Sequence, residues 1–350
     1  MEKELKDIAL PWTEEEYRAD SALSYSTLAT YERGGFHSLN TLFDKKETPS
    51  LTFGSCVDTL LTDGETAFNE RFAVMDYNIT DGGINVCKEL AVRYKDSYKE
   101  FKDIPEVLVS QTAQEVGFWK DPKWNNRRYK EVLNTGDVDI YYRVLTNSEK
   151  TIISSQTYTE VLAAVDALKT SEATKFYFAE NNPFDTSIRR YYQLKFKATL
   201  DGIDYRCMAD LILVDYEHKI VYPCDLKTSN HYESEFYKSF IDWNYQIQAR
   251  LYWRIIRANM DKDEFFKDFE LADYTFIVVK KDSLVPLAWK FPDTKKEGTI
   301  ICGKNKDLEL RDPEDIGKEL TYYLNNECKV PIGISITEPN DIVEYLNTKM

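Results

Sequence analysis

Histidine, long apolar runs and paired cysteines are scarce or absent in this chain of 350 residues. The three histidines, at positions 37, 218 and 231, are too few and too dispersed for a histidine-rich zinc site. No run approaches the roughly 18 apolar residues of a membrane span. The first residues, Met-Glu-Lys-Glu-Leu-Lys-Asp, are charged and have no secretory pattern. We therefore expect a cytoplasmic protein that does not engage a membrane.

Cysteine usage excludes two further classes of protein. The six cysteines have no paired spacing and no Cys-x-x-Cys, and they fall at positions 56, 87, 207, 224, 302 and 328. Scattered cysteines of this kind are typical of reduced thiols in a cytosolic protein rather than of a disulfide framework. They also predict that the chain holds no iron–sulfur cluster.

An excess of positive charge is also missing, since the formal net charge is −15. A uniformly acidic surface would repel phosphate groups, so any nucleic-acid contact requires local basic patches. Residues 118–130 hold five basic residues and one acid among aromatic residues. Such a segment suits single-strand or frayed-end binding, or equally a solvated loop with buried tryptophans. With a second patch before the central strands, the candidate DNA-binding residues are Arg127, Arg128, Lys130, Arg189, Arg190 and Lys195.

One near-match to a phosphate-binding loop is set aside. Gly298-Thr-Ile-Ile-Cys-Gly303-Lys304-Asn305 carries asparagine where the serine or threonine that holds Mg²⁺ is required. It also follows a charged stretch rather than a buried strand. We expect no ATP binding.

What the chain does contain is an ordered set of polar residues: Asp210, then Asp225-Leu226-Lys227, then Gln248 and Tyr252. Two carboxylates can hold a hard divalent cation, and a lysine beside them can position water and offset developing negative charge. Both aspartates interrupt apolar runs that should be buried, and a buried carboxylate without a partner is costly. This arrangement therefore favours metal-dependent phosphodiester hydrolysis over a solvated strand face.

The local pattern predicts where these residues lie. Residues 187–200, 205–214 and 219–227 are predicted strands, the last two joined as a hairpin through the polar residues 215–219. Because side chains alternate along a strand, Asp225 and Lys227 should share one face. Pro223 cannot donate to a ladder and belongs at an edge or a bulge. A helix over about 240–259 would place Gln248 and Tyr252 on one face, although Tyr252 could equally be a core tyrosine.

The stretch from about Gln193 to Trp253 resembles the core of the PD-(D/E)XK nuclease superfamily, and most closely the RecB/RecE-like exonucleases of phage and bacterial recombination systems. The segment Leu23-Ser24-Tyr-Ser26-Thr-Leu28 and the later Gly54-Ser-Cys-Val-Asp58 are similar to two N-terminal motifs of the RecE-like group. Two positions depart from the family pattern. Asp58 stands where relatives carry a metal-binding histidine, and Gln193 stands near a supporting glutamate. Asp58 could bind the metal or simply face water.

The resemblance implies a fold, a site and an activity. The fold is α/β, a restriction-endonuclease-like core with a central mixed β-sheet flanked by helices and with helical N-terminal and C-terminal additions. Mg²⁺ or Mn²⁺ would be held by Asp210, Asp225, the Leu226 backbone carbonyl and Asp58, while Lys227 orients the attacking water and Gln248 and Tyr252 border the site. The expected function is a metal-dependent DNA exonuclease acting at duplex ends, with a single-strand annealing protein and a ring-shaped homo-oligomer as possible assemblies. A catalytically inactive DNA-binding scaffold and a structure-specific endonuclease remain alternatives.

The expected organisation is one nuclease domain over residues 1–350. Within it we expect a helical N-terminal part over 1–75, a DNA-contact insertion over 76–150, the core over 151–290 and a C-terminal extension over 291–350. Finer expectations are a turn at Asp81-Gly-Gly83, a helix over 86–102, an amphipathic helix over 154–169, a strand over 274–279 and a last helix over 312–327.

Overall fold

The structure is a computed structural model that describes residues 3–43, 48–148, 150–292, 299–301 and 308–325. Its contacts divide the chain into two compact units. Unit 1 is Met1–Leu51 with Asp166–Met350, and unit 2 is Thr52–Val165. The chain is mixed α/β, as expected, but its organisation differs from the predicted single domain with an insertion over 76–150. The separate unit is larger than that insertion because it also takes in residues 52–75 and 151–165.

The mixed sheet of unit 1 follows the order β3-β4-β5-β7-β8. The strands are β3 (Ile188–Leu200), β4 (Ile203–Asp215), β5 (Ile220–Thr228), β7 (Tyr274–Val279) and β8 (Leu287–Phe291). Neighbours are antiparallel except β5 and β7, which are parallel. The short β6 (Glu270–Leu271) also pairs with β5. The predicted strands and the hairpin between β4 and β5 are confirmed.

Pro223 lies in an interior strand, but at an interruption of the ladder. On one side of β5, Val221 pairs with Leu271 of β6, and pairing resumes only at Cys224 with Thr275 of β7. Pro223 falls between these two stretches, so the pairing there does not depend on its missing N–H. The gap between β6 and β7 thus accommodates Pro223 inside the sheet, where the sequence predicted an edge or a bulge.

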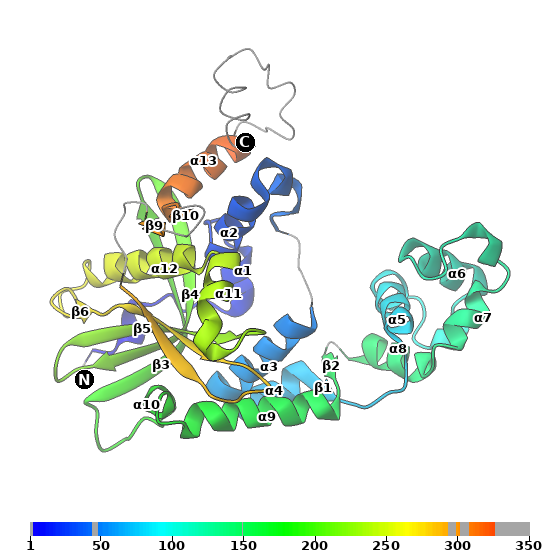
Figure 1. The fold of residues 1–350 in the computed structure, drawn as a ribbon, viewed down its shortest axis with the longest axis horizontal. Helices are drawn as coiled ribbons and strands as arrows, with labels where there is room; N and C mark the ends of the chain where they lie inside the picture. Colours follow the sequence, from blue (N-terminus) through cyan, green and yellow to red (C-terminus); the bar gives the residue numbers. More distant parts are fainter. Residues whose placement is uncertain (1–2, 44–47, 149, 293–298, 302–307, 326–350) are drawn as a thin grey trace, which may run out of the picture. The chain divides into compact units, whose positions relative to one another are not determined.

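The connection from β5 to β7 contains two helices rather than the one predicted. They are α11 (Phe236–Asp242) and α12 (Tyr245–Met260), preceded by the 3-10 helix η5 (Glu233–Glu235). Asn244, with a left-handed φ of 55°, separates them. Buried residues of α12 such as Ile247, Leu251 and Ile255 join the core formed with the sheet. The helix therefore packs across the sheet (Figure 1).

The N-terminal part of unit 1 consists of short helices: η1 (Leu5–Ile8), α1 (Glu14–Ala19), α2 (Tyr25–Gly34) and η2 (Gly35–Thr41). Helix α2 ends at Gly34, and the next residue, Gly35, has a φ of 53°. A positive φ at this position favours glycine, which has no Cβ. A short helix, α10 (Lys175–Phe178), precedes β3.

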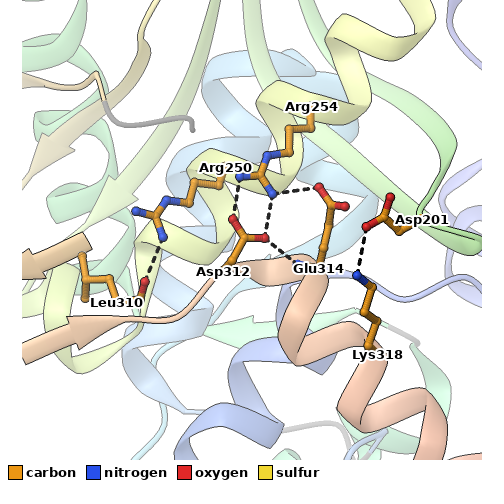
Figure 2. A network of polar contacts seen from close by, with 7 residues as sticks. All are labelled: Asp201, Arg250, Arg254, Leu310, Asp312, Glu314 and Lys318. Atoms are coloured by element: carbon orange, nitrogen blue, oxygen red, sulfur yellow. Dashed lines mark hydrogen bonds and ion pairs between the residues drawn. The ribbon is translucent and has the colours of Figure 1, made fainter. Parts of the chain in front are cut away.

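The C-terminal elements are β9 (Thr299–Ile301), β10 (Leu308–Leu310) and α13 (Pro313–Asn325), which lies within the predicted last helix. They are fastened to α12 by buried charges (Figure 2). Arg254 donates to Asp312 at 2.7 and 2.8 Å and to Glu314 at 2.9 Å, while Arg250 donates to the Leu310 carbonyl at 3.0 Å. Most of the phosphate-loop-like stretch at 298–305 lies outside the described residues.

Unit 2 is mainly helical. Its elements are α3 (Pro49–Thr62), α4 (Gly64–Arg71), β1 (Phe72–Val74), α5 (Asp81–Tyr94), η3 (Phe101–Asp103), α6 (Glu106–Glu115), η4 (Pro122–Trp124), α7 (Arg128–Leu133), α8 (Val138–Asn147), β2 (Thr151–Ile153) and α9 (Ser155–Thr170). Helices α3 and α9 extend across the boundaries of the unit. The predicted turn at Asp81–Gly83 is wrong because the Thr80 side chain caps the Gly83 N–H and starts α5 there. The predicted helix over 86–102 ends at Tyr94, whereas the helix over 154–169 is confirmed as α9.

Candidate functional site

Asp225 is the most enclosed residue of the candidate site, with an exposed fraction of 1%. The Gln248 amide nitrogen on α12 donates a hydrogen bond to its Oδ1, and the Lys227 ammonium forms an ion pair with its Oδ2. Asp225 and Lys227 share a face because they are two residues apart on β5. The predicted neighbours Asp225, Lys227 and Gln248 are therefore in contact.

Asp210 reaches the same place from the neighbouring strand. The β4–β5 ladder ends at the pair Leu211–Cys224. Beyond that pair, the Asp210 carboxylate accepts a hydrogen bond from the Leu226 backbone N–H at 3.1 Å. A side chain thus replaces the ladder where the two strands separate, and it brings both aspartates to the same part of β5.

The Lys227 ammonium is surrounded by an aromatic ring and two carboxylates. Its ammonium is 4.8 Å from the centroid of the Tyr245 ring. Burial by itself would lower the pKa of Lys227, but Asp225, together with Tyr245 and Asp210, outweighs burial and raises it. Lys227 therefore keeps its proton at neutral pH and acts as a fixed positive charge.

Two tyrosines complete the surroundings of the carboxylates. Tyr252 is 7% exposed, and its ring centroid lies 6.3 Å from that of Tyr274. Burial raises the pKa of both hydroxyls well above the usual value, and Asp225 and Asp210 add to the effect. Tyr252 is thus a buried core tyrosine that also lies near the two carboxylates of the site.

Tyr274 is a site neighbour that the sequence did not indicate. Its buried hydroxyl has no hydrogen-bond partner within the described part of the chain. It lies at the start of β7, a predicted strand, but nothing in its spacing links it to Asp225. Only the parallel pairing of β5 with β7 brings the two together.

The donor set suits a hard divalent cation. Asp210 and Asp225 supply carboxylate oxygens, Leu226 offers a backbone carbonyl, and Mg²⁺ and Mn²⁺ prefer such ligands. The buried Gln248 Oε1 has no hydrogen-bond partner among the described residues, so it could accept from a metal-bound water. Within those residues no three or more His, Cys, Asp or Glu side chains gather as a metal-binding group. Water would therefore complete the coordination, as is usual for Mg²⁺.

Asp58 lies on α3 in unit 2 and is half-buried. Gly54, one turn earlier, lies on the same helix, as the motif predicts. The role of Asp58 as a metal ligand stays a prediction.

Two of the predicted DNA-binding arginines are structural. Arg128 is 2% exposed and donates to the carbonyls of Trp119, Ser110 and Asp121 and to the Gln114 side chain. Arg190 is 8% exposed and donates twice to the Phe176 carbonyl. Their buried guanidinium groups donate to acceptors within the protein. The prediction that these two arginines contact DNA phosphates is therefore wrong. The sequence pair Arg127-Arg128 does not indicate which arginine is buried, because neighbouring residues of a helix point in different directions.

The other four predicted basic residues differ in exposure. Arg127 and Lys130 are exposed. Arg189 is half-buried and donates to the Asn182 carbonyl at 2.7 Å, and Lys195 is half-buried and donates to the Gln193 carbonyl at 3.3 Å. A role in DNA binding stays a prediction for these four residues.

No helix in the described ranges is long and apolar enough to cross a membrane. Compared with known proteins, the chain matches no family model and no curated protein. The case for a function therefore depends on the site itself.

Proposed function

We propose that this protein is a metal-dependent nuclease that hydrolyses phosphodiester bonds at DNA ends. The observation that carries the proposal is the convergence of Asp210, Asp225 and Lys227 where β4 and β5 separate. Two acidic oxygen donors beside a lysine that keeps its proton form a combination suited to a phosphate ester and a divalent cation.

Each residue has a role that follows from its contacts. Asp210, Asp225 and the Leu226 carbonyl would hold Mg²⁺ or Mn²⁺. The bound ion would supply Lewis-acid stabilisation of phosphate oxygens and a water of lowered pKa. Gln248 fixes the orientation of Asp225 through its amide N–H. Lys227 directs a positive charge at the place where negative charge develops and orients the attacking water.

In the absence of other cations Lys227 also neutralises Asp225. A buried carboxylate left without a partner would be costly, and the ion pair removes that cost. The same lysine repels an incoming cation. Occupation of the site is therefore coupled to the position of the Lys227 ammonium.

A digestion time course tests the proposal. End-labelled linear duplex DNA is incubated with the protein in Mg²⁺, in Mn²⁺ and in EDTA, beside a covalently closed circle of the same sequence. We expect metal-dependent loss of the linear DNA from its ends and no loss of the circle. Cleavage of the circle would instead indicate an endonuclease with the same chemistry. If neither DNA is cleaved in either metal, the protein is a DNA-binding scaffold or has another function.

A further inference from the structure

The connection from β5 to α12, which follows Lys227 in the chain, exposes three large aromatic side chains. Tyr232, Tyr237 and Trp243 have exposed fractions of 58%, 52% and 52%. All three lie in the segment that begins just after Lys227 and ends at Tyr245, whose ring contacts the Lys227 ammonium. Exposed aromatic residues are therefore concentrated in the connection between the two elements that carry Lys227 and Gln248.

Each of these rings has a cation over it, and two of the three cations pair with carboxylates. Lys280 is 5.3 Å from the Tyr232 ring and pairs with Asp282, and Lys238 is 5.9 Å from the Tyr237 ring and pairs with Glu235. Arg33 is 5.2 Å from the Trp243 ring. Among the described residues no carboxylate lies within ion-pair distance of Arg33, although exposed Asp242 is adjacent to Trp243 in sequence. Trp243 thus combines an exposed ring with a positive charge that forms no ion pair within the described part of the chain.

The backbone at Trp243 is held in place from α2. Its carbonyl accepts hydrogen bonds from the Tyr25 hydroxyl at 2.8 Å and from Arg33 at 3.2 Å. Asn244 follows in the left-handed region with a φ of 55°. Such a conformation costs energy in a residue other than glycine and persists where the surroundings impose it. The exposed indole is therefore presented by a fixed backbone, which lowers the entropy lost when a ligand binds.

The distance to the site is short. Trp243 and Tyr245 are two residues apart, so their Cα atoms are separated by at most about 7.6 Å. The Tyr25 ring lies 6.2 Å from the Tyr245 ring, which links the support of Trp243 to the residue that contacts Lys227. The exposed Trp243 ring is therefore presented two residues from Tyr245, the residue whose ring contacts the Lys227 ammonium.

We infer that Trp243 and Arg33 bind an unpaired base and an adjoining phosphate of a DNA strand beside the candidate site. The inference deepens the proposed function and rests on it: the substrate is an end with unpaired bases rather than a fully paired end. An aromatic face stacks on any base, and a neighbouring guanidinium attracts the phosphate, so the contact is independent of sequence. The Ser24-Tyr25-Ser26 segment then supports this contact through the Tyr25 hydroxyl.

The test measures binding without cleavage, with Ca²⁺ in place of Mg²⁺, by fluorescence anisotropy. The ligands are a blunt duplex, the same duplex with a short single-stranded tail, and the tailed duplex with abasic sites in the tail. For the wild type we expect the normal tail to bind more tightly than the abasic tail. Trp243→Ala should weaken binding to the normal tail by about tenfold, the size expected for loss of one base–aromatic stack. Trp243→Tyr should restore most of the affinity.

Two controls separate this contact from a general effect. Phe184→Ala removes an aromatic residue that is 96% exposed on the loop before β3 and should leave all three affinities unchanged. Arg33→Gln should weaken binding of both tailed ligands, which keep the tail phosphates, and reduce the log–log salt slope by about one unit. Equal binding of tailed and abasic DNA by wild type and Trp243→Ala alike would overturn the inference. If the wild type still cleaves linear DNA in that case, the proposed function stands. If the wild type neither binds nor cleaves DNA, both the proposed function and this inference are wrong.

Discussion

Gln193 lies at the level of Asp210 in the sheet and has a φ of 52°, the only positive value in β3. The register places it between the pairs Tyr192–Leu211 and Leu194–Ala209. A strand residue in the left-handed region carries backbone strain, and such strain concentrates at functional sites. The position where the resemblance expects a glutamate thus keeps an unusual conformation next to a candidate metal ligand, although its side chain is an amide.

Replacing Lys227 tests the chemistry apart from binding. Lys227→Ala should lower the cleavage rate by about a hundredfold or more, since the lysine acts on charge that develops in the transition state. Affinity for DNA measured in Ca²⁺ should stay close to the wild-type value. Lys262→Ala, an exposed lysine, is the matched control and should cleave normally. Wild-type cleavage by Lys227→Ala would show that another group activates the water.

Removing the charge of Asp210 should abolish metal binding while sparing the fold. Mg²⁺ or Mn²⁺ at a hundred times its Kd should stabilise the wild type by about 2.7 kcal/mol, because it binds only the folded state. Asp210→Asn loses this gain but keeps an oxygen that can accept from the Leu226 N–H. Thermal melting with and without metal measures the effect, with exposed Asp268→Asn as control. A wild type whose melting temperature and calorimetric titration show no response to either metal argues against the metal site.

The neighbours Arg127 and Arg128 should separate a surface role from a structural one. Arg128→Ala removes the hydrogen bonds that its buried guanidinium donates to three backbone carbonyls, each worth about 1.5–3 kcal/mol for a charged donor. It should therefore destabilise unit 2 by several kcal/mol in urea unfolding. Arg127→Ala should leave stability unchanged, and it should flatten the salt dependence of DNA binding if Arg127 contacts a phosphate. Equal stability of the two variants would contradict the buried role of Arg128.

Loss of Arg254 should loosen the C-terminal helix. Its guanidinium pairs with Asp312 and Glu314, whose side chains are 1% and 8% exposed. Arg254→Ala leaves both carboxylates buried without their partner, which costs about 3–5 kcal/mol. Urea unfolding should show this loss, and a triple variant with Asp312→Asn and Glu314→Gln should recover part of it. Arg18→Ala removes an exposed ion pair with Glu14 and should change stability by less than about 1 kcal/mol.

Acid should weaken the attachment of the N-terminal segment through Asp20. Burial by itself would raise the pKa of Asp20, but the Ala22 N–H and Lys197 outweigh burial and lower it below the ordinary 3.8. Its contribution to stability is therefore fully present above about pH 3.8 and is lost as the pH falls through the lower folded-state pKa. Asp20→Asn should lower stability at neutral pH and flatten its fall between about pH 4 and 2. A pH series of urea unfolding curves for both proteins provides the measurement.

The central strands and the polar set on them could be predicted from the sequence. Strand alternation and the Asp225-x-Lys227 spacing depend on local geometry, and Gln248 follows from a helix whose apolar face must cover the sheet. The position of Tyr274 could not be predicted because it depends on the pairing of β5 with β7 across a long crossover. The break at Asn244 was missed because the helical pattern continues through it.

Charge patterns were a weaker guide than strand patterns. A basic run indicates positive charge near a segment, but exposure is decided by the tertiary contacts of each side chain. Arg128 and Arg190 are held by backbone carbonyls of residues up to 18 positions away in the sequence. The composition gave no sign that these two arginines serve the core.

The hydrogen bond between Leu226 and Asp210 gives the site a built-in spectroscopic reporter. Backbone amides in a sheet are shielded from solvent by neighbouring strands, but the partner of the Leu226 amide is a titratable carboxylate. Its proton chemical shift and its exchange with deuterium therefore respond to the charge on Asp210 and to any ion bound there. In a spectrum of the isotope-labelled protein, the Leu226 amide signal would follow occupancy of the site without a substrate or a substitution.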